Sequence, residues 1–244
     1  MANVLERYGI KEVADVTFYA LDREEKPTHP VLYLDTLKVS TIEQTAEEAT
    51  ASGGKGNAPL IVWDYGKEIT VTLEDALFSP KSLAIMFGDA DGINSTVGVI
   101  RKTVHPSQIE DGGVTINGKL IKPVENTEKG TGITYYTADG TETTATDAVY
   151  AVVAFEPTEM QTIDVSANSF PGTYYVTGDT YARNEANGTD EFFQFIIPKA
   201  KVQSENTITM EADGDPSVFN MSLKVLRPKT GTMMKLVKYD VTAE

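Results

Sequence analysis

The feature that most restricts the fold of this sequence is a hydrophobic period of two residues. Val16, Phe18 and Ala20 alternate with their neighbours in this way, as do the apolar residues of the stretches 68–73 and 207–225. Successive side chains of a β-strand point to opposite faces, so this period is typical of strands with one buried face. The sequence therefore predicts a chain made mainly of β-strands.

Other segments predict strands because they alternate or because short apolar runs stand between turn residues. These strands are expected at residues 31–40, 60–64, 96–104, 114–121, 148–155, 173–176, 192–202 and 233–239. Two turn signals refine the pattern. Gly214 and Pro216 divide the stretch 207–225 into an expected hairpin. Asn117-Gly118 offers an alternative hairpin turn inside the fourth of these segments, because a type I′ turn favours positive φ at both central positions.

One segment predicts an α-helix. Ser79 can cap it, Pro80 suits its first position, and Gly88 follows its last apolar residues. Its apolar side chains fall near one face, which is expected to pack against a sheet. A weaker candidate, residues 74–78, is either a second helix or a separate turn. The predicted fold class is thus mainly β with one packed helix.

Three polar segments resemble long connections, namely residues 45–57, 125–147 and 178–190. Loops of this length are uncommon in compact domains unless they are functional or become ordered against a partner. No repeat and no compositional linker divides the chain, so residues 1–244 are interpreted as one domain. An inserted subdomain at residues 111–187 is the alternative.

The charge balance excludes one class of function. With 36 acidic and 21 basic residues, the formal net charge is −15. A protein that grips nucleic acid needs clustered Lys and Arg, whereas this acidic excess repels a polyanion; solubility is the plain alternative explanation of the charge. The chain has no cysteine, no signal-like N-terminal segment and no apolar run near the roughly 20 residues of a membrane span. These absences predict a soluble protein of a reducing cytoplasm.

No group of residues has the pattern of a catalytic or cofactor site. The two histidines, His29 and His105, stand beside prolines and are interpreted as surface turn residues. The glycine-rich stretch 52–57 lacks P-loop spacing. The acidic stretch 88–94 has oxygen ligands suited to calcium but lacks EF-hand spacing, and is interpreted as a turn. We therefore predict a protein without enzymatic activity, cofactor or metal.

One alternative from another class depends on the single tryptophan. Trp63 is either a core aromatic on a buried strand, which is the preferred interpretation, or a sugar-stacking platform. The chain also has 11 tyrosines and a surplus of carboxylates, and glycoside hydrolysis uses carboxylates in pairs. A carbohydrate-binding or carbohydrate-degrading β-sandwich therefore stays open as an alternative.

Two longer stretches carry a family resemblance. Residues 41–88, TIEQTAEEATASGGKGNAPLIVWDYGKEITVTLEDALFSPKSLAIMFG, and residues 210–240, MEADGDPSVFNMSLKVLRPKTGTMMKLVKYD, resemble tail structural proteins of bacteriophages, particularly those infecting Gram-positive hosts. The tail tube family implies a β-sandwich or half-barrel whose sheets join between subunits. It also implies hexameric rings that stack into a hollow tube, which conducts DNA without binding it specifically.

The resemblance also sets expectations for location and partners. The protein is expected in the virion tail after assembly in the host cytoplasm, in contact with copies of itself and other tail proteins and with no membrane. A negatively charged lumen would repel the phosphates of passing DNA. A capsid, decoration or baseplate protein of the same virion is the nearest alternative.

On this resemblance, residues 41–57 form an arm or loop that contacts a neighbouring ring. The candidate inter-subunit contacts there are Glu43, Glu47, Glu48 and Lys55. Strand edges within residues 31–40 and 192–202 are further candidates for pairing between subunits, because unpaired edges invite association.

Overall fold

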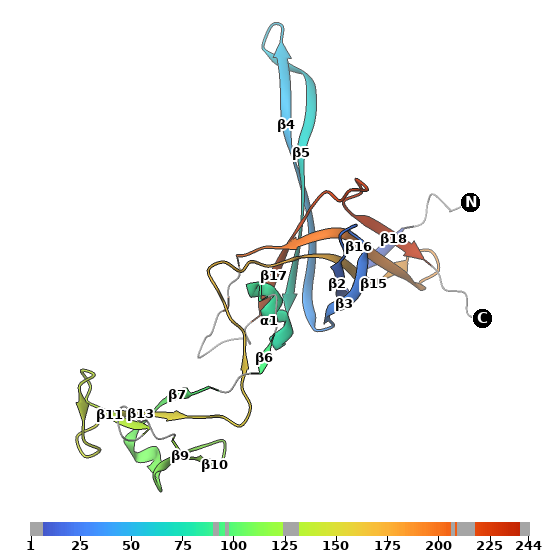
Figure 1. Ribbon diagram of the computed structural model, residues 1–244. Coiled ribbons are helices and arrows are strands. Elements are labelled where there is room, and N and C mark those ends of the chain that lie inside the picture. The colour runs from blue at the N-terminus through green and yellow to red at the C-terminus, as the bar shows by residue number, and fades with distance from the viewer. Residues whose placement is uncertain are drawn as a thin grey trace. The chain divides into compact units, whose positions relative to one another are not determined.

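The computed structural model describes residues 7–89, 93–95, 98–123, 132–205, 208 and 218–239. These residues form mainly antiparallel β-strands, with one α-helix and one short 3-10 helix (Figure 1). The chain divides into two compact units. Unit 1 comprises Met1–Ile93 and Ile163–Glu244, and unit 2 comprises Asn94–Thr162.

Unit 1 is built on one nine-stranded antiparallel sheet. Its strands are β1 (Tyr8–Ile10), β2 (Asp15–Leu21), β3 (Pro27–Leu34), β4 (Leu37–Gly53), β5 (Ala58–Asp75), β15 (Thr173–Asn184), β16 (Asp190–Val202), β17 (Phe219–Val225) and β18 (Lys235–Tyr239). Seven of them follow the order β3-β2-β15-β16-β17-β5-β4. Of the other two, β1 pairs with β15 and β18 pairs with β16.

The core of unit 1 is one cluster to which both ends of the sheet contribute. Phe18 of β2, Leu73 of β5 and Ile197 of β16 are wholly buried in it. Burying a side chain of this size stabilises the fold by about 1.5–3 kcal/mol. Leu34 of β3 and Leu37 of β4 join the same cluster although their strands end the sheet on opposite sides. The sheet therefore curves around its core, as a β-sandwich or half-barrel requires, and the predicted fold class is confirmed.

Helix α1 (Pro80–Phe87) confirms the predicted helix and both of its ends. The Ser79 hydroxyl accepts a hydrogen bond from the backbone N–H of Ser82, and the Ser82 hydroxyl accepts one from the backbone N–H of Ser79, each at 3.0 Å. Gly88 ends the helix with φ at 77°. A Cβ added to Gly88 would lie 2.3 Å from the backbone of Phe170, so this position requires glycine. The buried face of the helix packs against the core of unit 1.

Unit 2 contains short strands around a small core of its own. They are β6 (Asn94–Ser95), β7 (Ile100–Val104), β8 (Ile109–Glu110), β9 (Gly113–Ile116), β10 (Lys119–Ile121), β11 (Ile133–Tyr136), β12 (Glu142–Thr143), β13 (Tyr150–Phe155) and β14 (Gln161–Thr162). The sheets have the orders β12-β11-β13-β7, β10-β9-β8 and β14-β6, and the 3-10 helix η1 spans Pro106–Gln108. Val104, Val114, Ala151 and Val153 form the buried cluster, so the first two sheets share one core.

The segment 111–187, the alternative inserted subdomain, overlaps unit 2 up to residue 162. Strand β15, which lies in the later part of that segment, belongs to the sheet of unit 1. Autonomous folding of an inserted subdomain stays a prediction.

The three predicted long connections are largely wrong. Residues 45–57 belong mostly to the hairpin of β4 and β5, and residues 178–190 mostly to β15 and β16. The described part of 125–147 contains β11 and β12, with Asp139-Gly140 in the turn between them. At residues 45–57 the sequence misled because an exposed two-stranded ribbon buries neither face, and the apolar period that marks a strand is then lost. At residues 178–184 the buried positions are occupied by Gly178, Thr180, Ala182 and Asn184, which are small or polar and give no apolar period.

Other expectations are refined. Residues 31–40 hold parts of two strands, because the chain turns between β3 and β4. Asn117 and Gly118 have φ of 50° and 74°, which confirms the hairpin turn between β9 and β10. Residues 74–78 end β5 and then bend, so they form no second helix. Most of the first strand and the turn of the hairpin expected at 207–225 lie outside the described residues, whereas its second strand, β17, is confirmed.

A charged bridge joins three segments of unit 1. Glu25 lies in the turn between β2 and β3 with φ at 65°. Its carboxylate accepts hydrogen bonds from Nζ of Lys199 and from the backbone N–H of Lys229, both at 2.7 Å, and its side chain is only 17% exposed. The hydrogen bond from Lys199 makes the largest contribution to lowering the pKa of the Glu25 carboxyl, and the bond from Lys229 lowers it further.

Replacing Glu25 by Gln is expected to lower the thermal unfolding midpoint at pH 7 and to have a smaller effect at about pH 3. The folded-state pKa lies below the unfolded value of about 4.3, so the bridge stabilises the fold above that pH and loses its effect as the pH falls through the folded-state pKa. Scanning calorimetry at both pH values measures this difference. Glu24→Gln is the control. The ion pair that Glu24 forms with Lys26 is 71% and 70% exposed, so its loss should change stability little. An equal loss in both variants would contradict the prediction.

Candidate assembly surfaces

Strands β4 and β5 form a hairpin whose outer part, residues 43–67, is called the arm. The strands pair from Leu37 with Asp75 to Gly53 with Ala58. All but two of the arm residues are exposed, and buried core positions resume only at Ile69. Figure 1 shows the arm projecting away from the rest of the sheet. At about 3.3 Å per residue, it extends roughly 30 Å.

A tight turn closes the arm at its end. Gly54, Gly56 and Asn57 have φ of 78°, 90° and 50°, values that suit glycine and asparagine. The strands therefore stay paired almost to the tip, where Lys55 is exposed. The segment interpreted as an arm or loop is an arm.

All four predicted contact residues lie exposed on the arm. They are Glu43, Glu47, Glu48 and Lys55. Glu48 stands directly opposite Asp64, and opposed like charges in neighbouring strands are unfavourable. Among the described residues, no ion pair involves any of the four. The arm thus presents uncompensated carboxylates, and their contact with a neighbouring subunit stays a prediction.

The arm also carries an exposed apolar face. Ile61, Trp63 and Tyr65 are 52%, 53% and 52% exposed, and as alternate residues of one strand they share a face. Ala51 and Ala49 stand opposite Ile61 and Trp63 on that face. Alanine is too small to cover these side chains, so the face, called the aromatic face below, lies open to solvent.

The preferred interpretation of Trp63 as a core aromatic is wrong. An apolar run such as residues 60–63 resembles a buried strand when it is considered alone. The available signal was in the partner strand, where Glu47 and Glu48 interrupt any apolar face. The aromatic face lies on a two-stranded ribbon, which is open rather than concave, so its exposure alone does not favour sugar binding.

The two predicted pairing edges have different outcomes. The prediction of an edge at residues 192–202 is wrong. These residues belong to β16, which pairs with β15 on one side and with β18 and β17 on the other. Strand β3 does end the sheet, and β4 ends it on the opposite side. Pro27 and Pro30 lack the N–H group that a new partner of β3 would need. The edge of β4, including its arm, is therefore the freer of the two.

An acidic patch lies on the sheet face opposite the core. Asp15 of β2 stands opposite Asp179 of β15, a second pair of opposed like charges. The Tyr33 hydroxyl donates a hydrogen bond to Asp15 at 3.3 Å, and the Gln194 amide donates one to Asp179 at 2.7 Å. Desolvation, together with the carboxylates of Asp15, Asp35 and Asp179, raises the pKa of Tyr33.

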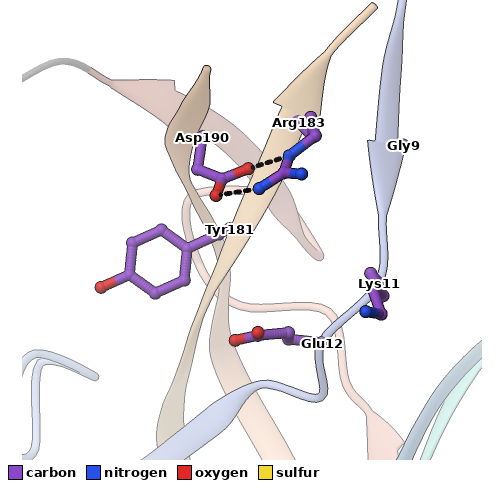
Figure 2. Close-up of a pocket in the computed structure, with 6 residues that line it drawn as sticks. All are labelled: Gly9, Lys11, Glu12, Tyr181, Arg183 and Asp190. Atoms are coloured by element: carbon purple, nitrogen blue, oxygen red, sulfur yellow. Dashed lines mark hydrogen bonds and ion pairs between the residues drawn. The ribbon is translucent and has the colours of Figure 1, made fainter. Parts of the chain in front are cut away.

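A small cavity of about 160 Å³ lies near the end of the β15–β16 hairpin, and Figure 2 draws the residues that line it. It is lined by Gly9, Lys11, Glu12, Tyr181, Arg183 and Asp190. Arg183 donates two hydrogen bonds of 2.7 Å to the two carboxylate oxygens of Asp190, and this pairing lowers the pKa of Asp190. This bidentate pair joins the two strands near the end of the hairpin. Because each charged group is already hydrogen-bonded to the other, the pair is poorly suited to proton transfer.

The remaining candidates show no arrangement suited to catalysis or metal binding. His29 is exposed within β3 rather than in a turn, and His105 caps η1, with its Nδ1 2.8 Å from the Ser107 hydroxyl. Residues 90–92 of the acidic stretch lie outside the described residues. Elsewhere in the described chain, no three His, Asp or Glu residues are grouped to hold a metal ion. None of its described helices has the length and apolar content to cross a membrane.

These features define a β-rich structural subunit with an open sheet edge and a protruding arm. The chain belongs to the YomU/Tube protein family, whose family model matches residues 8–238. It is also similar to the tail tube protein of Bacillus phage SPR, with 28% identity over 215 residues. That alignment covers 83% of this chain and 78% of the relative. The predicted membership of a phage tail tube family is confirmed.

Proposed function

We propose that this protein is the repeating subunit of a phage tail tube, in which rings of six copies stack around a channel that conducts DNA. The arm carries this proposal. It extends roughly 30 Å from the core, and a two-stranded hairpin is at best marginally stable in water. Contact with another protein surface would stabilise the arm by covering its exposed carboxylates and aromatic face. In a polymer of identical subunits, a neighbouring copy can provide that surface.

The acidic patch supports a channel-facing role for its face of the sheet. Opposed carboxylates such as Asp15 and Asp179 cost stability in the subunit, which a functional requirement would explain. Negative charge along a channel repels the phosphates of DNA and keeps the passing molecule from adhering. The protein would then handle DNA without specific binding and without catalysis.

Location and partners follow from the same proposal. Subunits would assemble in the cytoplasm of the bacterial host and remain in the virion tail, in contact with other tail proteins at the two ends of the tube. The family match and the similarity to a tail tube protein favour this role over a capsid, decoration, baseplate or carbohydrate-active protein.

Negative-stain electron microscopy of the purified full chain tests the proposal. Six-membered rings and stacked tubes are expected, with light scattering showing the corresponding increase in mass as the concentration rises. A protein that stays monomeric at every concentration, also in the presence of the other tail proteins of its virion, would overturn the proposal.

A further inference from the structure

We propose that the aromatic face of the arm in one copy docks into a methionine-lined groove at the root of the arm in the next copy. This inference rests on the self-assembly proposed above and identifies the surface that receives the arm. Nothing beyond a second copy of the same chain is required as the partner.

The groove has a volume of about 290 Å³ and lies in unit 1. It is lined by Gln44, Lys67, Ile69, Gly231, Met233 and Met234. Ile69 is buried, whereas Met233 and Met234 are half-buried and pack against the core. Methionine is unbranched and polarisable, so it adapts to an incoming side chain and makes favourable contacts with aromatic rings. The groove thus combines adaptable apolar walls with the polar side chains of Gln44 and Lys67, which suits an amphipathic aromatic ligand such as Trp63.

The arm cannot fill the groove of its own chain. Gln44 and Lys67 at the groove and Trp63 on the arm belong to the same paired hairpin. Trp63 is separated from Lys67 and Gln44 by about four to five residues of strand, or roughly 13–16 Å, along a ribbon that would have to break its pairing to fold back. The groove and the aromatic face are also different surfaces, so their contact is head-to-tail. Head-to-tail contacts repeat into rings or filaments.

Charge complementarity favours the same pairing. Residues 218–239 contain no acid in a chain of net charge −15. Their cations are Lys224, Arg227, Lys229, Lys235 and Lys238. Lys224 is already paired with Glu68, but within the described chain neither Lys67 nor Lys235 has an ion-pair partner. Glu47 stands opposite Tyr65 on the aromatic face, so its uncompensated carboxylate would meet these lysines beside the groove.

Disulfide cross-linking tests this contact, and the chain has no native cysteine to interfere. A full-length Ile61→Cys protein is mixed with a full-length Met234→Cys protein and oxidised. Val62→Cys is the matched control, because Val62 is equally exposed but faces the other side of the same strand. Since a disulfide needs Cβ atoms about 3.5–4.5 Å apart, we expect the Ile61→Cys mixture to yield about tenfold more cross-linked heterodimer.

The possible outcomes separate this inference from the proposed function. Tubes that form normally without an excess of the Ile61–Met234 cross-link would overturn the docking site and leave the tail tube proposal intact. A specific cross-link without rings or tubes would support the docking site and overturn the tube. Equal yields from Ile61→Cys and Val62→Cys would also overturn the assigned face.

Fluorescence gives a second measurement, because Trp63 is the single tryptophan of the chain. Its emission is expected to shift to shorter wavelength on assembly of the unmodified protein, as the indole leaves water. A Met233→Ser, Met234→Ser double variant is expected to keep the emission of an exposed tryptophan. A full shift in that variant would overturn the docking site even if the cysteine variants failed to fold.

Discussion

Replacing residues 46–67 by an Asn-Gly turn is expected to abolish tube growth while unit 1 stays folded. Thr45 and Glu68, which the new turn would join, are already paired across the hairpin. The removed residues are all exposed or nearly so, and none belongs to the core cluster. The unfolding midpoint should therefore change by only about the effect of ordinary surface substitutions. Electron microscopy of the assemblies and calorimetry of the subunit measure the two expectations.

Tubes of normal length from the shortened protein would contradict the assigned role of the arm. Loss of the folded state would instead show that the arm stabilises the subunit itself. A matched control is Glu142→Gln in unit 2, which changes an exposed carboxylate away from the arm and should leave tube growth unchanged.

Gly178→Ala is expected to destabilise unit 1 by about 3 kcal/mol, the upper range for overpacking a core. Gly178 of β15 stands directly opposite Phe195 of β16, whose ring covers it. An added Cβ would lie 2.1 Å from two ring carbons, and Phe195 is only 3% exposed, so the ring has little room to move. Denaturant unfolding monitored by circular dichroism measures the loss.

Gly9→Ala is the matched control for this substitution. Gly9 lies in β1, and nothing lies within 4 Å of a Cβ added there, so the same chemical change should have little effect. Phe195→Leu should recover part of the stability in the Gly178→Ala background, although it costs stability alone. Equal losses for Gly178→Ala and Gly9→Ala, or no coupling with Phe195→Leu, would show that ring contact is not the cause.

The sequence predicted best where local signals and burial agree. The helix was bounded correctly because Ser79, Pro80 and Gly88 specify its ends through backbone chemistry alone. Strand β17 was bounded correctly because its alternating side chains lie on a core face, with Met221 and Leu223 buried. In both elements the tertiary fold reinforces a preference that a short window of sequence already contains.

The arm shows why the remaining features could not be predicted in the same way. Its two strands bury neither face, so alternation gives no signal, and Trp63 looks like a core residue although the subunit leaves it exposed. The edge status of β16 also depended on β17 and β18, which pair with it from a distant part of the chain. Positions set by long-range pairing, or by surfaces that a second copy would cover, are not specified within one local window.

Strands β6 and β14 give the chain a natural point for grafting. Asn94 pairs with Thr162 and Ser95 with Gln161, so the entry and exit of unit 2 run side by side, about 5 Å apart. A foreign domain whose own ends lie equally close together can be spliced between them without stretching the flanking chain. If the subunits polymerise as proposed, such chimeras would carry one foreign domain per subunit at a regular spacing.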